Sequence, residues 1–324
     1  MRKFVHLNAR AVDGAVSVLQ RYGAKASVIA GGTDLLGKMK DEILPTYPEA
    51  IINLKSIPGL DFIKEEEGML RIGALTRLED IATNPLVHSR YRALAEAAHR
   101  TASPHIREMG TIGGNLCQDI RCWYYRNPHN RFPCLRKGGG RCYAIEGDNR
   151  YHSIFDSSVK GGCLAVHPSD TSPALIAVDA VVKTSKRLIH AEDFFEVNVM
   201  KTTVLEHDEI VTEIRVQAPP ADTKSSFVKF ASRKTIDFPI VNCAAMITTS
   251  VGKVSGARIC LNAVYVKPYR ALKAEESIRG KGIDETTART AGDAAVFDAK
   301  PLRHNRYMVQ IAKTMVERAI LACR

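Results

Sequence analysis

The chain has 324 residues, of which 45% are hydrophobic and 25% charged, and its formal net charge is +11. These values describe a soluble globular protein of two or three domains rather than a membrane-embedded one, since no uninterrupted run of 18 apolar residues occurs. The basic N-terminus has no apolar segment or cleavage site typical of a signal peptide, so we expect a cytoplasmic protein without membrane attachment. The positive charge suggests an acidic partner, which could be nucleic acid, an anionic cofactor or an acidic protein surface.

The first part of the chain mixes helical and strand-like patterns. Apolar residues at helical spacing predict a helix over 11–22 that ends at Gly23. Short apolar runs predict strands at 27–30, 50–54 and 69–72. A longer pattern predicts a helix at 90–100. The mixture predicts an α+β fold.

The second part of the chain follows a polar stretch that contains two prolines. We place a domain boundary near 219–224, because such segments commonly link domains. Beyond it, 257–266 alternates as a strand. An amphipathic helix is predicted near the C-terminus from apolar residues at helical spacing: Met308, Ile311, Ala312, Met315, Val316 and Ala319.

Two glycine turns could each hold an oxyanion. The first follows the strand candidate and comprises Gly31, Gly32, Thr33 and Asp34; the second comprises Thr111, Gly113, Gly114 and Asn115. Neither matches the dinucleotide-binding or P-loop fingerprints. Each alone is typical of a plain strand-to-helix turn. Together they suit a diphosphate held from two sides by backbone amides.

Five of the eight cysteines lie between 117 and 163, in a stretch rich in glycine and arginine. Eleven residues separate Cys122 from Cys134, seven separate Cys134 from Cys142, and twenty separate Cys142 from Cys163. No CxxC pair occurs, so the spacing fits zinc poorly and an iron-sulfur cluster better, while isolated structural cysteines stay an alternative. Disulfides are disfavoured in a reducing compartment. The other three cysteines, in apolar surroundings, are predicted to be buried: Cys243, Cys260 and Cys323.

In order along the chain, "IAGGTDLL", "TIGGN" and "HPSDTSPALIAVDA" resemble the FAD-binding subunit of the molybdenum hydroxylases, the xanthine dehydrogenase and carbon monoxide dehydrogenase family. The resemblance covers essentially the whole chain. It implies a two-part FAD-binding domain (PCMH-like) at 1–218 and a smaller α+β C-terminal domain at 222–324. FAD is the implied cofactor.

About fifty residues between Asn115 and Asp170 exceed the usual family pattern and resemble an insertion in the beta subunit of 4-hydroxybenzoyl-CoA reductase. That insertion carries a [4Fe-4S] cluster. The resemblance implies an iron-sulfur insertion at about 117–163 with Cys122, Cys134 and Cys142 as ligands. The fourth ligand departs from the pattern, because the reductase has a cysteine where this chain has Tyr151. Cys163 is then the expected fourth ligand, and Cys117 is the reserve.

The same resemblance implies the FAD-binding residues. Around the diphosphate they are Ile29, Ala30, Gly31, Gly32, Thr33, Asp34 and Leu35, together with Thr111, Gly113, Gly114 and Asn115. Asp170 aligns with an acid that contacts the cofactor, and Val211 and Lys229 align with residues near the isoalloxazine ring. The plain alternatives are a core strand residue for Val211 and a surface amine for Lys229.

The family implies an electron-transfer subunit with no catalytic residue of its own. Substrate is handled by a separate molybdenum-cofactor large subunit, and a small subunit holds [2Fe-2S] clusters, in a dimer of heterotrimers. Eight Lys or Arg against three acids between 121 and 162 suggest that the insertion docks an acidic carrier such as ferredoxin or flavodoxin. Arg131, Arg136 and Lys137 are the exposed charges that we expect there.

The alternative is a metal-stabilised module that binds nucleic acid through the basic loop. Its stacking residues would be Trp123, Tyr124 and Tyr125. This alternative leaves both glycine turns without a role. We therefore expect no nucleic-acid partner.

Overall fold

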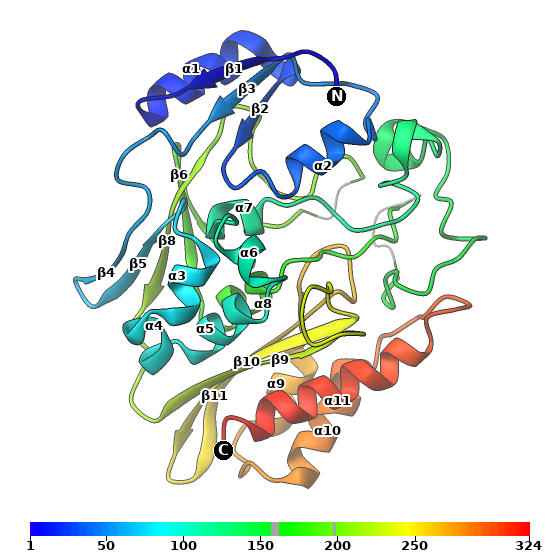
Figure 1. Ribbon diagram of the computed structural model, residues 1–324. Helices are drawn as coiled ribbons and strands as arrows, with labels where there is room; N and C mark the ends of the chain where they lie inside the picture. The colour runs from blue at the N-terminus through cyan, green and yellow to red at the C-terminus, as the bar shows by residue number, and fades with distance from the viewer. Residues whose placement is uncertain (157–161, 197–198) are drawn as a thin grey trace.

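Three sheets organise the fold of the computed structural model, which describes residues 1–156, 162–196 and 199–324 (Figure 1). The first is parallel and the other two are antiparallel. The α+β class predicted from the sequence is confirmed.

The N-terminal sheet has three strands in the order β1-β3-β2. These are β1 (Val5–Asn8), β2 (Ala26–Ile29) and β3 (Ala50–Asn53). Helix α1 (Val12–Tyr22) buries Ala15 and Leu19 in the same core. It ends as predicted at Gly23, whose φ of 54° is a conformation that glycine adopts readily. After β2 and the first glycine turn, α2 (Leu35–Lys40) begins.

The second sheet has the order β4-β5-β8-β6-β7. Its strands are β4 (Ile63–Glu66), β5 (Met69–Gly73), β6 (Val181–Thr184), β7 (Leu188–His190) and β8 (Val211–Gln217). The helices between β5 and β6 are α3 (Leu78–Thr83), α4 (Pro85–Arg90), α5 (Arg92–His99), α6 (Pro104–Arg107), α7 (Ile112–Leu116) and α8 (Thr171–Ala177). Apolar residues of all of these helices except α6 share one core with the sheet.

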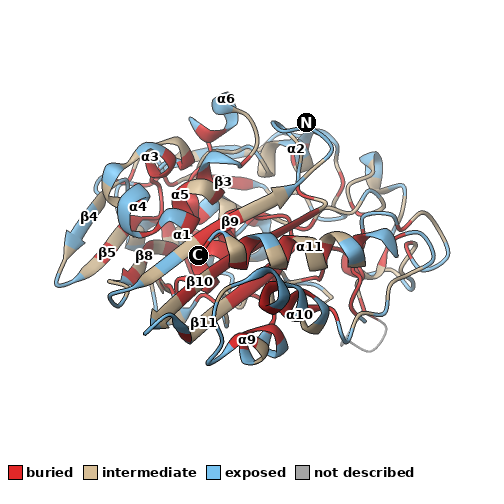
Figure 2. Ribbon diagram, turned by 90° about the horizontal axis from the view of Figure 1, so that it is seen from below, coloured by how far each residue is buried: buried red, intermediate tan, exposed pale blue. Residues whose placement is uncertain are grey.

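The third sheet belongs to the C-terminal part and has the order β12-β11-β10-β9. Its strands are β9 (Thr223–Phe230), β10 (Val241–Ser250), β11 (Lys253–Asn262) and β12 (Tyr269–Arg270). The helices α9 (Leu272–Ile278), α10 (Glu285–Ala295) and α11 (Tyr307–Leu321) pack against it, and buried residues run along β10 and these helices (Figure 2). Small alanines of α5 and α8 pack against β9 and β10, which joins the sheet to the rest of the protein.

The cysteine-rich insertion has little regular structure and contains the short turns η2 (Pro128–Asn130) and η3 (Leu135–Lys137). It lies at one end of the molecule beside α2 and the C-terminal part (Figure 1). The His129 amide donates to the Asp41 carbonyl, and the Ile154 amide donates to the Val264 carbonyl. The insertion therefore has backbone hydrogen bonds to both parts of the fold.

Most predicted elements agree with the structure. The helix expected over 90–100 is divided at Tyr91, where α4 ends and α5 begins. The boundary expected near 219–224 falls in the loop between β8 and β9 and runs into the first residues of β9. Cys243, Cys260 and Cys323 are buried, as predicted.

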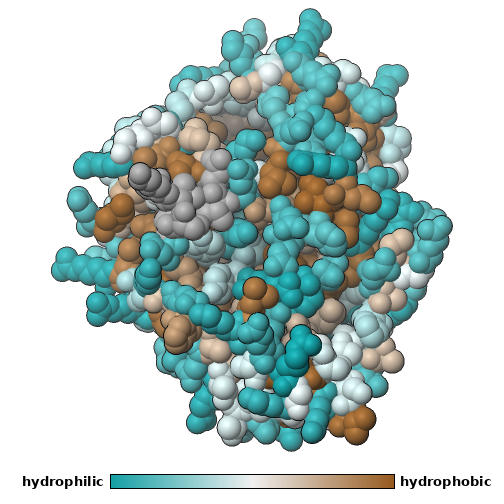
Figure 3. All heavy atoms as spheres, turned by 180° about the vertical axis from the view of Figure 1, so that it is seen from behind, coloured by the Kyte–Doolittle hydropathy of each residue, from teal (hydrophilic) through white to brown (hydrophobic). Residues whose placement is uncertain are grey.

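None of the described helices is long and apolar enough to cross a membrane. The face shown in Figure 3 is mostly hydrophilic, with apolar side chains in separate patches. Scattered apolar groups of this kind are normal on a protein surface.

Candidate cofactor site

A large pocket of about 510 Å³ opens between the first two sheets. Thirteen of the fourteen residues expected to contact FAD line it: Ile29, Ala30, Gly31, Gly32, Thr33, Asp34, Leu35, Thr111, Gly113, Gly114, Asn115, Asp170 and Val211. The loop 236–238 of the C-terminal part also contributes to the wall. The structure thus brings together segments that are more than 180 residues apart in sequence.

The two glycine turns contact each other at one wall of the pocket. A Cβ on Gly31 would lie 2.8 Å from the carbonyl carbon of Met109 and 2.9 Å from the Cα of Gly110. Real side chains do not fit at such distances, so only glycine allows the turns to meet. Gly32 has a φ of 75°, which an L-residue adopts only with strain.

The turns differ in how their backbone amides are used. Among the described residues, the amides of 31–34 donate no hydrogen bond and are available to a ligand. The amides of Ile112, Gly113 and Gly114 already donate to oxygens of the chain, the last to the Thr111 hydroxyl. The expectation of bare amides holds for the first turn and is wrong for the second, which forms the start of α7.

Asp170 and Lys229 form a buried ion pair across the junction between α8 and β9. Lys229 Nζ lies 2.7 Å from Asp170 Oδ2, and both side chains are only 3% exposed. Burial raises the pKa of Asp170, and the opposing effect of Lys229 does not cancel this shift. Asn242 donates to the other carboxylate oxygen at 2.7 Å. The alternative that Lys229 is a surface amine is therefore wrong, although Lys229 is not part of the pocket lining.

Val211 is 7% exposed and belongs to both the sheet core and the pocket wall. Val211 can therefore be a core residue of the strand and also lie near a bound cofactor. The β8 strand presents it at the strand's first position, where the sheet meets the pocket.

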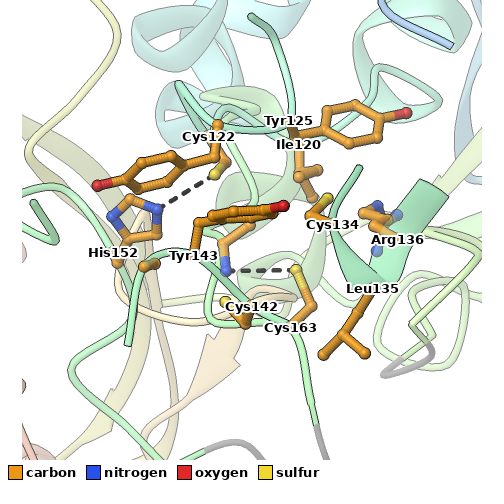
Figure 4. Close-up of a pocket in the computed structure, with 13 residues that line it drawn as sticks. Ile120, Cys122, Tyr125, Cys134, Leu135, Arg136, Cys142, Tyr143, His152 and Cys163 are labelled. Atoms are coloured by element: carbon orange, nitrogen blue, oxygen red, sulfur yellow. Dashed lines mark hydrogen bonds between the residues drawn. The ribbon is translucent and has the colours of Figure 1, made fainter. Parts of the chain in front are cut away.

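A second, smaller cavity lies inside the insertion and is called the cysteine cavity. It is lined by Cys122, Cys134, Cys142 and Cys163, with His152 and Tyr143 between them (Figure 4). Cys117 does not reach it and lines the large pocket instead. The structure thus brings together the four expected ligands and separates the reserve cysteine from them.

Burial favours the protonated form of two thiols of this cavity. It raises the pKa of Cys122 to about 12 and also raises that of Cys163. His152 Nε2 lies 3.2 Å from Cys122 Sγ, and burial lowers the pKa of His152 to about 4, so the imidazole is neutral at pH 7. Among the described residues, no group of three or more His, Cys, Asp or Glu is arranged to hold a metal ion. The cavity that the four cysteines line has a volume of about 20 Å³.

Two of the three charges expected on the surface are buried. Arg136 is 5% exposed and donates to the Thr202 hydroxyl at 2.5 Å, and Lys137 is 7% exposed. Both belong to η3, which turns inward directly after Cys134. The prediction that they are exposed is wrong, whereas Arg131 is exposed as expected.

Ion pairs surround Asp34 at the edge of the large pocket. Asp34 Oδ1 lies 2.8 Å from both Arg121 and Arg126, and Asp34 Oδ2 accepts from the Asp119 amide at 3.0 Å. Burial alone would raise the pKa of Asp34, but the two arginines and Lys38 outweigh burial and lower it. Asp34 is therefore ionised at the edge of the pocket.

The aromatic residues of the insertion pack against each other and against buried polar groups. Tyr125 is 4% exposed, and its hydroxyl donates to Asp119 at 2.5 Å. Trp123 contacts Tyr124 and Tyr151 edge to face. Tyr125 thus has no ring face free for stacking on a base, which weakens the nucleic-acid alternative.

Comparison with known proteins identifies the family. Residues 2–219 match the family described as FAD binding domain in molybdopterin dehydrogenase, and residues 226–323 match the CO dehydrogenase flavoprotein C-terminal domain. The chain belongs to the FAD-binding subunits of the molybdenum hydroxylases. The FAD cofactor expected from the sequence agrees with this family.

Relatives of this FAD-binding subunit cover its whole length. It is 32% identical to the aldehyde oxidoreductase FAD-binding subunit PaoB of Escherichia coli, over 96% of this chain and 95% of that one. It is 30% identical to the carbon monoxide dehydrogenase medium chain of Hydrogenophaga pseudoflava, over 99% and 96%. A solved structure of carbon monoxide dehydrogenase from the same organism, lacking the Mo-pyranopterin moiety, superimposes with a TM-score of 0.79 at 29% identity, over 99% and 97%.

Two polar groups of the FAD-binding subunit, the buried His152 and the partly buried Asp119, were not predicted from the sequence. His152 lies against a cysteine of the cavity, but one histidine thirty residues from Cys122 gives no local signal. Asp119 has a lowered pKa: burial opposes the shift, but Lys38 and Arg136 outweigh it. Arg136 belongs to the same cysteine segment as Asp119, whereas Lys38 comes from α2, 81 residues away in sequence.

Proposed function

We propose that this subunit holds one FAD in the large pocket and one [4Fe-4S] cluster in the cysteine cavity, and relays electrons between them. The observation that carries the proposal is that four cysteines of one insertion line a single cavity next to the large pocket. The segment 117–122 connects the two sites, because Cys117 lines the large pocket and Cys122 lines the cysteine cavity. The proposed division is 1–218 for the FAD-binding domain and 222–324 for the C-terminal domain, in keeping with the two family matches.

The first glycine turn would hold the FAD diphosphate. Its free amides and the Thr33 hydroxyl point to a site where phosphate oxygens can accept hydrogen bonds. The second turn would contribute shape, because its glycines leave room and its amides are already used. Asp170 and Val211 would contact the flavin from the remaining walls, while Lys229 would act through its ion pair with Asp170.

The cysteine cavity suits an iron-sulfur cluster by the chemistry of its lining. Four thiols supply the thiolate ligands that such clusters need, and they line one cavity. The thiols would lose their protons on binding, since metals bind the thiolate form. A flavin exchanges electrons in pairs or singly and a cluster exchanges them singly, which supplies the relay. The proposed pairing of a flavin with a [4Fe-4S] cluster resembles that of the beta subunit of 4-hydroxybenzoyl-CoA reductase.

The partners that we propose follow the family. A molybdenum-cofactor large subunit would contain the substrate site, and a small [2Fe-2S] subunit would connect it to the flavin, as a dimer of heterotrimers. Relatives are named as medium chains and FAD-binding subunits, which supports a multi-subunit assembly. A cytoplasmic location stays a prediction.

An acidic external carrier such as ferredoxin would dock beside the cysteine cavity. With Arg136 and Lys137 buried, the exposed arginines of the described insertion are Arg131, Arg141 and Arg150, and the exposed acids are Glu146 and Asp156. Arg150 pairs with Asp148, which leaves Arg131 and Arg141 as the charges proposed to dock the carrier. Arg141 lies over the ring of Tyr143, 4.5 Å from its centroid, and Tyr143 lines the cavity. Neither arginine has an ion-pair partner among the described residues, so both charges are available to an acidic surface.

The fourth ligand is tested by two matched serine substitutions. Cys163→Ser is expected to lose or degrade the cluster, because it removes a thiol from the cavity. Cys117→Ser is expected to keep the iron content, because that thiol faces the large pocket. Iron and acid-labile sulfide are measured in both variants after anaerobic purification.

The opposite pattern, in which the serine at 117 removes the iron and the serine at 163 does not, would reverse the ligand assignment. Stoichiometric zinc without iron in the parent protein would refute the cluster altogether.

A further inference from the structure

Lys137 is a buried cation that has no ion-pair partner among the described residues, and burial lowers the pKa of its ammonium. Lys137 is 7% exposed, and its Nζ atom makes no hydrogen bond to any described residue. Its ammonium lies 5.7 Å from the centroid of the Tyr125 ring, a contact that is weak beside an ion pair. The groups nearby that could become negative are the thiols of Cys134 and Cys122.

An unpaired ammonium in this position is unfavourable in the protein alone. Burying an ionised group without a partner costs several kcal/mol, so such lysines normally have a carboxylate beside them. The neighbouring Arg136 shows the usual solution, since it lies 3.6 Å from Asp119 and donates to Thr202. While the nearby cysteines are protonated thiols, no described residue supplies the negative charge that would offset the Lys137 ammonium.

The backbone fixes this inward position. Lys137 closes the η3 turn that begins after Cys134, and Gly138 follows with a φ of 84°. A Cβ on Gly139 would lie 2.7 Å from the carbonyl carbon of Pro133 and closer still to its oxygen. The chain thus doubles back tightly behind Cys134, and the amides of Lys137 and Gly139 both donate to the Cys134 carbonyl. The same turn that presents a cavity cysteine thus buries the Lys137 side chain behind the cavity lining, to which the preceding Arg136 belongs and Lys137 does not.

We propose that Lys137 is the internal counter-charge of the cluster and sets its reduction potential. The inference rests on the proposed function of the cysteine cavity. A [4Fe-4S] core with four thiolates is net negative, and taking up one electron adds a further negative charge. A fixed, poorly solvated positive charge nearby stabilises the reduced form more than the oxidised form, because attraction grows with the charge. Lys137 thereby favours electron acceptance by the cluster.

The test compares Lys137→Met, which keeps the length and removes the charge, with Lys137→Arg, which keeps the charge. The exposed Arg131→Met is the control for a charge lost at the surface of the same insertion. Each full chain is purified anaerobically, its iron is measured, and the cluster is titrated with a reductant while its paramagnetic signal is followed. We expect the equilibrium constant for one-electron reduction to fall at least tenfold in Lys137→Met, a shift of about 59 mV to more negative potential.

In Lys137→Arg and Arg131→Met we expect the potential to stay close to that of the parent. Loss of iron from Lys137→Met but not from Lys137→Arg would also support the counter-charge. An unchanged potential in Lys137→Met, or equal loss of iron from both Lys137 variants, would overturn the inference while leaving the cluster in place in the parent. A parent protein without iron would instead refute the proposed function, and the inference would fall with it.

Discussion

Gly31→Ala tests whether contact between the two glycine turns is required for FAD binding. The new Cβ would lie 2.8 Å from the Met109 carbonyl carbon and 2.9 Å from the Gly110 Cα. Ordinary carbon contacts are about 3.5–4.0 Å, so the turns would have to separate by roughly 1 Å. Overpacking of this kind costs about 1–3 kcal/mol. If the turns separate to relieve it, the FAD dissociation constant should rise roughly 5- to 150-fold.

Gly37→Ala is the matched control, because it makes the same change in α2, where a Cβ meets nothing within 4 Å. Apoprotein of each variant is titrated with FAD while flavin fluorescence is followed, and thermal unfolding is recorded without FAD. We expect Gly37→Ala to bind FAD as the parent does. Equal FAD affinity in Gly31→Ala and Gly37→Ala would refute the reasoning that the turns must touch to form the site.

Three further predictions concern charges. Lys229→Met leaves Asp170 buried without its cation, so the free energy of unfolding in urea should fall by about 3–5 kcal/mol; a change below 1 kcal/mol would contradict this. Burial lowers the pKa of His167 to about 3, so the folded state binds fewer protons than the unfolded state below about pH 6.5. The free energy of unfolding should therefore decrease as the pH is lowered, by about 2 kcal/mol from this group between pH 7 and pH 5. In His167→Gln, the free energy of unfolding measured in urea should depend less steeply on pH. Replacing Arg131 and Arg141 by Glu should slow stopped-flow reduction by an acidic carrier and weaken its salt dependence, with unchanged FAD and iron content; a rate indifferent to salt and charge would place docking elsewhere.

The fold and the large pocket were largely predictable because their signals are local. Glycine turns, strand runs and the C-terminal apolar pattern each appear within a few residues, and the structure has β2, β3, β5 and α11 at the predicted places. The family resemblance then indicated which distant segments meet. Gly31 shows what local signals do not predict. The sequence around it indicated a turn, whereas its contact with Met109 depends on the tertiary fold.

The charges of the insertion could not be predicted from the sequence. Arg131, Arg136 and Lys137 look alike in a basic, glycine-rich loop, yet only Arg131 is exposed. The η3 turn buries both Arg136 and Lys137, and Arg136 is also held by Asp119 of the same insertion and by Thr202 from a later part of the chain. The same holds for Lys229, whose neighbours on β9 gave no sign of Asp170.

The most direct test of the account is the cofactor content of the parent chain purified without oxygen. Flavin, iron, acid-labile sulfide and zinc are measured on one sample against protein concentration. We expect one FAD together with four iron and four sulfide per chain. FAD with no iron, or zinc in place of iron, would contradict the claim that the cysteine cavity holds an electron-transfer cluster beside the flavin.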